Sequence, residues 1–133
     1  MIPPFNNAGY LPPGIHLATV DEVAVRFGQD SELRQVQMES LRWLADLARR
    51  AGVSRLVVNG SFVTDRLEPN DVDCVLLIGP GFPRDAAANA DLAIGLPFVN
   101  MELVNPNAFR EFTEKIFATD RDLFPKGMIE VML

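Results

Sequence analysis

The sequence predicts an α/β fold, a two-layer α+β domain in which helices pack on a mixed sheet. Short runs rich in Val, Leu and Ile, at 55–59 and 71–78, have the length and composition of buried strands. Segments with apolar residues at helical spacing precede and follow them. Strands that alternate with helices are typical of helices packed on a sheet. The chain of 133 residues is expected to form a single domain over 1–133.

Residues 1–18 are expected to form an extended, proline-rich N-terminal arm. The residues in it that disfavour helices and strands are Pro3, Pro4, Gly9, Pro12, Pro13 and Gly14. The only histidine, His16, stands between two apolar residues. We interpret His16 as a structural residue rather than as a base or a metal ligand.

Two helices are expected after the arm. The first begins with a capping box formed by Thr19 and Glu22, and ends near Gly28. The second begins at Ser31 and ends at Gly52, a residue suited to a left-handed stop. The expected core positions of the second helix are Leu33, Val36, Leu41, Leu44, Leu47 and Ala48.

The same second helix carries a tryptophan among basic residues, namely Arg42, Trp43, Arg49 and Arg50. Two interpretations fit this pattern: a solvated face with one packed indole, which we favour, or a basic stripe for RNA. The net charge of −6 argues against a general nucleic-acid binder, which needs a broad basic face. A contact with an RNA end is therefore not favoured.

The second half of the chain is expected to continue the alternation. The sharp break at 79–83 is followed by a helix over 84–92, a strand over 98–104, a helix capped by Asn105-Pro106, and a strand over 128–133 with Glu130 facing outward. The expected core stripe of the last helix is Phe109, Phe112, Ile116 and Phe117.

Composition indicates a cytoplasmic protein. No apolar stretch is long enough to cross a membrane, and the N-terminus lacks the features of a secretory signal. The single cysteine, Cys74, excludes an internal disulfide and is expected in the core, opposite the face of Asp73.

A pair of acids opens the second strand. Strand side chains alternate between faces, so Asp71 and Asp73 project from one side, roughly 6–7 Å apart. Two carboxylates this close repel each other unless a cation or a proton lies between them, and Mg²⁺ is a usual cation for such oxygen ligands. Asp73 also interrupts an apolar run, which is costly unless it is paired. The alternative is a structural salt bridge with Arg55 or Arg66.

The first strand ends in Gly60-Ser61. A glycine at this position lets the backbone approach a phosphate, and the first amides of a short helix from Ser61 can hold phosphate oxygens. The alternative is a tight hairpin at Asn59-Gly60, since Asn-Gly between apolar runs is a strong hairpin signal.

This order of residues resembles the polymerase-β type nucleotidyltransferase superfamily. Its signature is Gly-Ser or Gly-Gly after a small hydrophobic strand, a loop of about ten residues, and Asp-x-Asp or Asp-x-Glu in a second strand. The wider chain is similar to small bacterial proteins assigned to that superfamily. The segments that carry the second likeness are Leu11-Pro12-Pro13-Gly14-Ile15-His16, Gly60-Ser61-Phe62-Val63-Thr64-Asp65 and Pro125-Lys126-Gly127. The resemblance implies a minimal nucleotidyltransferase fold that uses Mg²⁺ and an NTP.

The resemblance also implies roles for individual residues. Those implied for metal binding and catalysis are Asp71, Asp73 and Glu102, and those implied for phosphate binding are Gly60, Ser61, Arg66 and Lys126. Glu102 is the favoured third acid, but Asn100 lies on the same face and is the alternative occupant of that position. The sequence departs from many active members at Thr64 and Asp65, which stand where those members carry a basic residue and a glycine.

Two functions are therefore expected as alternatives. The first is a Mg²⁺-dependent minimal nucleotidyltransferase that moves NMP from an NTP to a hydroxyl, as part of a toxin–antitoxin or phage-defence pair. The second is a catalytically degenerate nucleotidyltransferase fold that acts as a protein-binding, antitoxin-like module. The absence of a C-terminal helical domain, which larger superfamily members carry, suggests a protein partner or a homo-oligomer.

Overall fold

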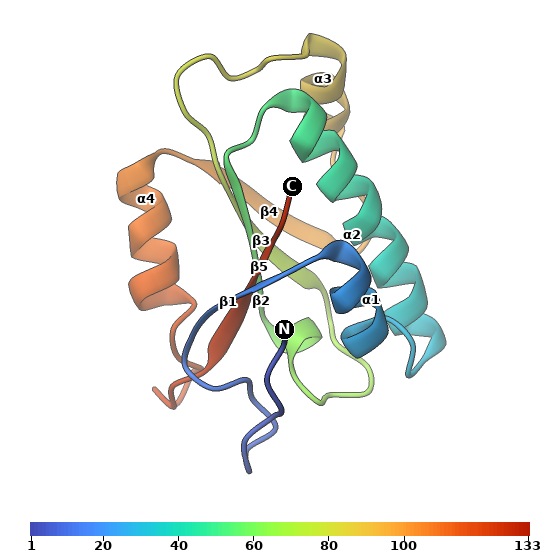
Figure 1. The fold of residues 1–133 in the computed structure, drawn as a ribbon, viewed down its shortest axis with the longest axis vertical. Coiled ribbons are helices and arrows are strands. Elements are labelled where there is room, and N and C mark those ends of the chain that lie inside the picture. Colours follow the sequence, from blue (N-terminus) through green and yellow to red (C-terminus); the bar gives the residue numbers. More distant parts are fainter.

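The computed structural model describes all residues, 1–133. Five strands form one mixed sheet in the order β1-β5-β2-β3-β4. Their bounds are β1 Gly14–Ala18, β2 Arg55–Asn59, β3 Val72–Leu77, β4 Val99–Val104 and β5 Gly127–Val131. Helices pack on this sheet, so the expected α/β fold is confirmed (Figure 1).

The register of the central strands determines which side chains share a face. β2 runs antiparallel to β3, with Asn59 opposite Asp73. β3 runs parallel to β4, with Asp73 beside Asn100. Because strand side chains alternate between faces, these three polar residues lie on the same face, at the ends of their strands.

The helices lie on both sides of the sheet in Figure 1. α1 (Val20–Phe27) and α2 (Glu32–Ala51) cover one face, with α3 (Ala86–Ile94) beside the C-terminal end of α2. α4 (Pro106–Glu111), extended by a π-helical turn over Phe112–Ile116, covers part of the other face.

The caps of the first two helices are those that the sequence predicts. Thr19 and Glu22 form a complete capping box at the start of α1, which ends at Gly28. Ser31 caps α2, and Gly52 ends it in the left-handed conformation, with φ 89°.

The main core lies between the sheet and α1, α2 and α3. Leu41, Leu44 and Leu47 are buried in it, as the spacing predicts. Leu33 is only partly buried, however, and Val36 is 40% exposed. The buried stripe of α2 begins instead with two polar residues, Arg34 and Gln37.

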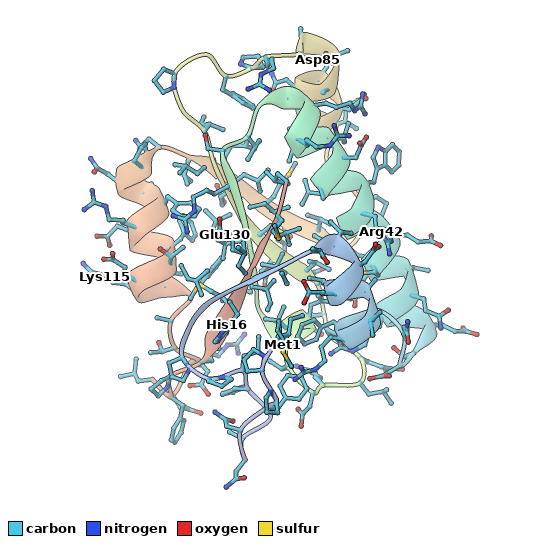
Figure 2. All side chains as sticks on the ribbon, in the orientation of Figure 1. Met1, His16, Arg42, Asp85, Lys115 and Glu130 are labelled. Atoms are coloured by element: carbon cyan, nitrogen blue, oxygen red, sulfur yellow. The ribbon has the colours of Figure 1, made fainter.

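The structure corrects the prediction for the N-terminal arm. Residues 14–18 are not part of an irregular extension but form β1, which pairs in parallel with β5 at the edge of the sheet. Strand pairing satisfies the backbone groups that an unpaired arm leaves to water. His16 lies on β1 (Figure 2), and its Nε2 donates a hydrogen bond of 2.7 Å to the carbonyl oxygen of Pro12.

Three further predictions for single residues are wrong. Glu130 does not face outward: it is half-buried, and the Arg55 guanidinium donates two hydrogen bonds to its carboxylate at 3.1 and 2.5 Å. Ile116 is 57% exposed rather than in the core, because the π-helical turn rotates it out of the stripe. The Trp43 indole is 57% exposed rather than packed.

The basic residues near Trp43 contact acids. Arg42 pairs with Asp21 of α1 at 3.0 Å, where the two helices meet (Figure 2). Arg49 and Arg50 both pair with Asp46. None of the helices combines the length and the apolar composition that a membrane span requires.

Candidate functional site

Three segments meet at one end of the sheet, at the bottom of Figure 1: the N-terminal arm, the loop between β2 and β3, and the loop before β5. The last two loops and the start of β3 and β4 enclose a cavity of about 840 Å³. Ten of its 11 lining residues are polar: Ser61, Arg66, Asn70, Asp71, Asp73, Asn100, Thr119, Asp120, Arg121 and Lys126, with Ile116 as the apolar one.

The two predicted acids lie together in this cavity. The amide nitrogen Nδ2 of Asn100 donates to Asp71 Oδ2 at 3.2 Å and to Asp73 Oδ1 at 3.3 Å. Both carboxylates therefore face the same small volume, next to the side chain of Asn100. An amide that rotates by half a turn offers its oxygen to a cation in that volume instead.

Gly60 is in close contact with Asp73. Its backbone has φ 81° and ψ −166°, a conformation that is unfavourable for every residue with a Cβ atom. A Cβ atom at this position would overlap the Asp73 carboxylate, only 3.0 Å from its Cγ. Glycine here allows the carboxylate to lie directly against the backbone turn that follows β2.

The turn after β2 is not the tight Asn-Gly hairpin that was the alternative. Ser61–Val63 forms a single 3₁₀ turn, and a longer loop then leads to β3. Ser61 lines the cavity and its hydroxyl oxygen accepts a hydrogen bond of 3.3 Å from the Asn70 backbone amide. The two ends of the loop are thereby joined.

Thr64 and Asp65, where the sequence departs from the superfamily pattern, have structural contacts. The Thr64 hydroxyl donates to the carbonyl oxygen of Ser61 at 2.7 Å. The Asp65 backbone amide donates to the carbonyl oxygen of Gly9, whose Cα lies against the Asp65 carboxylate. These two residues fix the loop to itself and to the N-terminal arm.

Three cations line the cavity beside the acids. Arg66 and Lys126 were predicted from the sequence; Arg121 was not. Burial lowers the pKa of Lys126, and the negative charges of Asp120 and Asp73 partly oppose that shift. A cavity with both a converging acid pair and several cations suits a ligand that carries anionic groups together with a metal ion.

The ionised form of Asp73 is disfavoured in the cavity, so its pKa is raised. Burial raises its pKa, and the neighbouring charge of Asp71 raises it further, while the Asn100 hydrogen bond and Lys126 act in the opposite direction. No salt bridge within 4.0 Å involves Asp73: Arg55 pairs with Glu130 instead, and Arg66 forms no ion pair with any acid. The predicted alternative, a structural salt bridge with Arg55 or Arg66, is therefore wrong.

Glu102 does not line the cavity. It follows Asn100 by two residues on the same face of β4 and is exposed. It lines a smaller, adjoining cavity with Phe112 and Phe117, which shares Asp73 and Asn100 with the larger one. Asn100, not Glu102, occupies the position against the two aspartates. The structure contains no group of three or more His, Cys, Asp or Glu side chains that could hold a metal ion.

The donor set fits one Mg²⁺ better than two. Mg²⁺ in proteins is usually held by one or two carboxylates together with substrate phosphates and water, and Asp71 with Asp73 matches that number. Asn59, buried opposite Asp73, has a side-chain oxygen without a hydrogen-bond partner. The third carboxylate of the cavity, Asp120, already accepts hydrogen bonds from the Tyr10 hydroxyl and from the backbone amides of Asp122 and Phe124, so it is not free for a second ion.

The loop before β5 contributes residues that the sequence did not reveal, namely Thr119, Asp120 and Arg121. Tyr10, the only tyrosine, ties this loop to the arm: its hydroxyl donates to Asp120 Oδ2 at 2.7 Å. Its backbone also bridges to Thr64 of the opposite loop. Both contacts of Tyr10 join segments that are far apart in the chain, so no local sequence pattern indicates them.

Comparisons with known proteins give a family but no further likeness. Neither a curated protein nor a solved structure matches the chain. A family model, described as a family of unknown function (DUF6932), matches residues 3–132. The chain therefore belongs to the family of unknown function DUF6932.

Proposed function

We propose that this protein is a minimal nucleotidyltransferase that binds an NTP with Mg²⁺ and transfers its NMP group to a hydroxyl. The observation that supports the proposal most is the convergence of Asp71 and Asp73 on one volume, against the Gly60 turn, in a cavity that also holds cations. The resemblance of Gly60-Ser61 and Asp71-x-Asp73 to the polymerase-β superfamily points to the same chemistry.

Each lining residue then has a role that its position allows. Asp71 and Asp73 hold the cation, and Asn100 orients their carboxylates or adds an oxygen ligand. When bound, Mg²⁺ neutralises negative charge on the phosphates. Ser61 contributes a hydroxyl donor, and Arg66, Arg121 and Lys126 attract the phosphate oxygens.

The transfer balances without a covalent enzyme intermediate. The acceptor oxygen forms a bond to the α-phosphorus, the bond from that phosphorus to the bridging oxygen breaks, and pyrophosphate leaves with the electron pair. The hydroxyl proton passes to solvent, because the cavity is open where Arg66, Asn70 and Arg121 are exposed. The loose transition state of phosphoryl transfer makes positioning and charge neutralisation the main contributions.

One observation favours a second candidate, a degenerate fold that binds a partner protein. The third acid position is held by Asn100, and Glu102 lies outside the cavity. Without a third carboxylate next to Asp71 and Asp73, the site lacks the ligand that two-ion chemistry requires there. In this case the cavity binds an NTP or another anion, and the partner protein binds the surface around the cavity. Under both candidates the protein acts in the cytoplasm, where NTPs are available, and a toxin–antitoxin or phage-defence pair supplies the partner.

Labelled ATP, CTP, GTP and UTP, each incubated with the protein and cell lysate, test the proposal. We expect label to appear on a macromolecule only when Mg²⁺ is present, and to be lost with Asp73→Asn. The matched control is Asp91→Asn, which removes an exposed carboxylate on α3. If the wild-type protein binds Mg²⁺ with NTP but transfers no label, the degenerate module is the better account.

A further inference from the structure

α2 carries a buried cation that forms no ion pair within 4.0 Å, although the charges of Asp30 and Asp65 act on it from further away. The Arg34 side chain is 2% exposed, and its guanidinium donates to the carbonyl oxygens of Phe27 at 2.9 Å, Phe62 at 2.7 Å, Thr64 at 2.9 Å and Arg66 at 3.0 Å. Arginine carries its donors in a fixed planar fork, which suits several acceptors at once. A buried charge is normally paired with an opposite charge, so this arrangement calls for an explanation.

Three of those four acceptors belong to the cavity loop. Phe62, Thr64 and Arg66 follow directly on Ser61, and the carbonyl of Arg66 accepts from both Nε and Nη2 of Arg34. The guanidinium therefore fixes the backbone from which the Ser61 hydroxyl and the Arg66 side chain reach the cavity.

One turn further along α2, Gln37 holds the other end of the same loop. It is fully buried, and its Nε2 donates to the carbonyl oxygen of Pro69 at 2.8 Å. Pro69 precedes Asn70 and Asp71, both of which line the cavity. The Gln37 side-chain oxygen has no hydrogen-bond partner, so the amide is retained there at a cost in free energy.

We propose that Arg34 and Gln37 are positioning residues, which hold both ends of the 61–70 loop in the geometry that binds the phosphates of an NTP. The inference rests on the proposed function for its ligand. It also accounts for a polar start to the buried stripe of α2: residues 34, 37, 41, 44 and 48 share one face.

Calorimetric titration of Mg²⁺–ATP into variants tests the proposal. Arg34→Lys keeps the charge but loses the planar fork, and Gln37→Met keeps the approximate shape but loses the donor to Pro69. We expect each to weaken Mg²⁺–ATP binding by about tenfold or more. The control is Leu44→Ala, which removes a buried core side chain about three turns along α2. We expect this variant to lose stability but to bind normally at a temperature where it is folded.

Trypsin cleavage after Arg66 provides a second measurement that needs no ligand. Cleavage at this bond should be faster in Arg34→Lys and Gln37→Met than in Leu44→Ala, because the first two release the loop itself, whereas Leu44→Ala exposes the bond only through global unfolding. Should Arg34→Lys fail to fold, Gln37→Met decides the question. Normal binding in the folded positioning variants overturns this inference alone, whereas no binding by the wild type overturns the proposed function and this inference with it.

Discussion

Gly60 shows how one residue type sets the geometry of the cavity. Its positive φ and its contact with the Asp73 carboxylate both require the absence of a side chain. Gly60→Ala should therefore lower the free energy of unfolding by roughly 1–3 kcal/mol, and should move Asp73 away from the turn. Urea denaturation measures the loss.

Gly81→Ala is the matched control for that measurement. Gly81 also has a positive φ, 88°, but no atom lies within 4 Å of the place where its Cβ would stand. It therefore reports the backbone cost alone. Equal losses for the two variants would show that the contact between Gly60 and Asp73 contributes nothing.

Asn100 lies against Asp71 and Asp73, at the position where the proposed nucleotidyltransferase function calls for a third acid. Asn100→Asp places a third carboxylate beside Asp71 and Asp73, so repulsion should lower the metal-free stability by roughly 1 kcal/mol. Mg²⁺ should reverse this, because it is attracted more strongly to three carboxylates than to two. Thermal unfolding with and without Mg²⁺ measures both effects. The matched control is Asn107→Asp, which adds a carboxylate at an exposed position of α4. The prediction would be contradicted if Mg²⁺ raised the melting temperature of Asn100→Asp no more than that of the wild type or of this control.

At the scale of elements, α2 shows what the sequence predicted and what it could not. The caps Ser31 and Gly52 and the apolar positions from Leu41 onward follow from local chemistry. The choice of Leu33 and Val36 for the first turns followed apolarity, whereas continuing the spacing of the stripe backward leads to Arg34 and Gln37. Burying an arginine is unfavourable unless its charge has hydrogen-bond partners. The carbonyl groups that bind Arg34 belong to other segments of the chain, so the sequence alone did not indicate that Arg34 would be buried.

The contact between the N-terminal arm and the loop before β5 should depend on pH. The hydrogen bond to Asp120 raises the pKa of Tyr10 and lowers the pKa of Asp120. The folded protein thus holds the phenol proton more tightly than the unfolded chain does. The contribution of Tyr10 to stability is complete below pH 10, its ordinary pKa, and is lost as the pH rises through the raised value. The contribution of Asp120 to stability is present above the ordinary pKa of an aspartate, and it is lost as the pH falls through the lowered pKa of Asp120 in the folded protein.

Because Tyr10 is the only tyrosine, phenolate absorbance reports its titration directly. In the wild type, phenolate should form above pH 10, the ordinary pKa of the residue, and in Asp120→Asn the midpoint should fall. A midpoint that is identical in the two proteins would show that the hydrogen bond does not hold the arm to the loop in solution.

At the scale of the whole molecule, the site combines predictable and unpredictable parts. The alternation of strand side chains predicts that Asp71 and Asp73 share a face. The position of Gly60 and Ser61 could also be predicted, because they directly follow the apolar run of the expected strand over 55–59. Thr119, Asp120 and Arg121 reach the cavity only because β5 returns beside β2 in the sheet. The place of Asn100 rather than Glu102 depends on the register between β3 and β4. Sheet order and register are tertiary properties, which single-sequence periodicity does not fix.

The central claim is that Asp71 and Asp73 bind a metal ion that carries an NTP. Calorimetric titration of ATP into the wild-type protein, with and without Mg²⁺, and into Asp73→Asn tests it most directly. The account predicts binding by the wild type that requires Mg²⁺ and is weakened at least about tenfold in Asp73→Asn, which remains folded by circular dichroism. No binding by the wild type with Mg²⁺, or equal binding by Asp73→Asn, would contradict it.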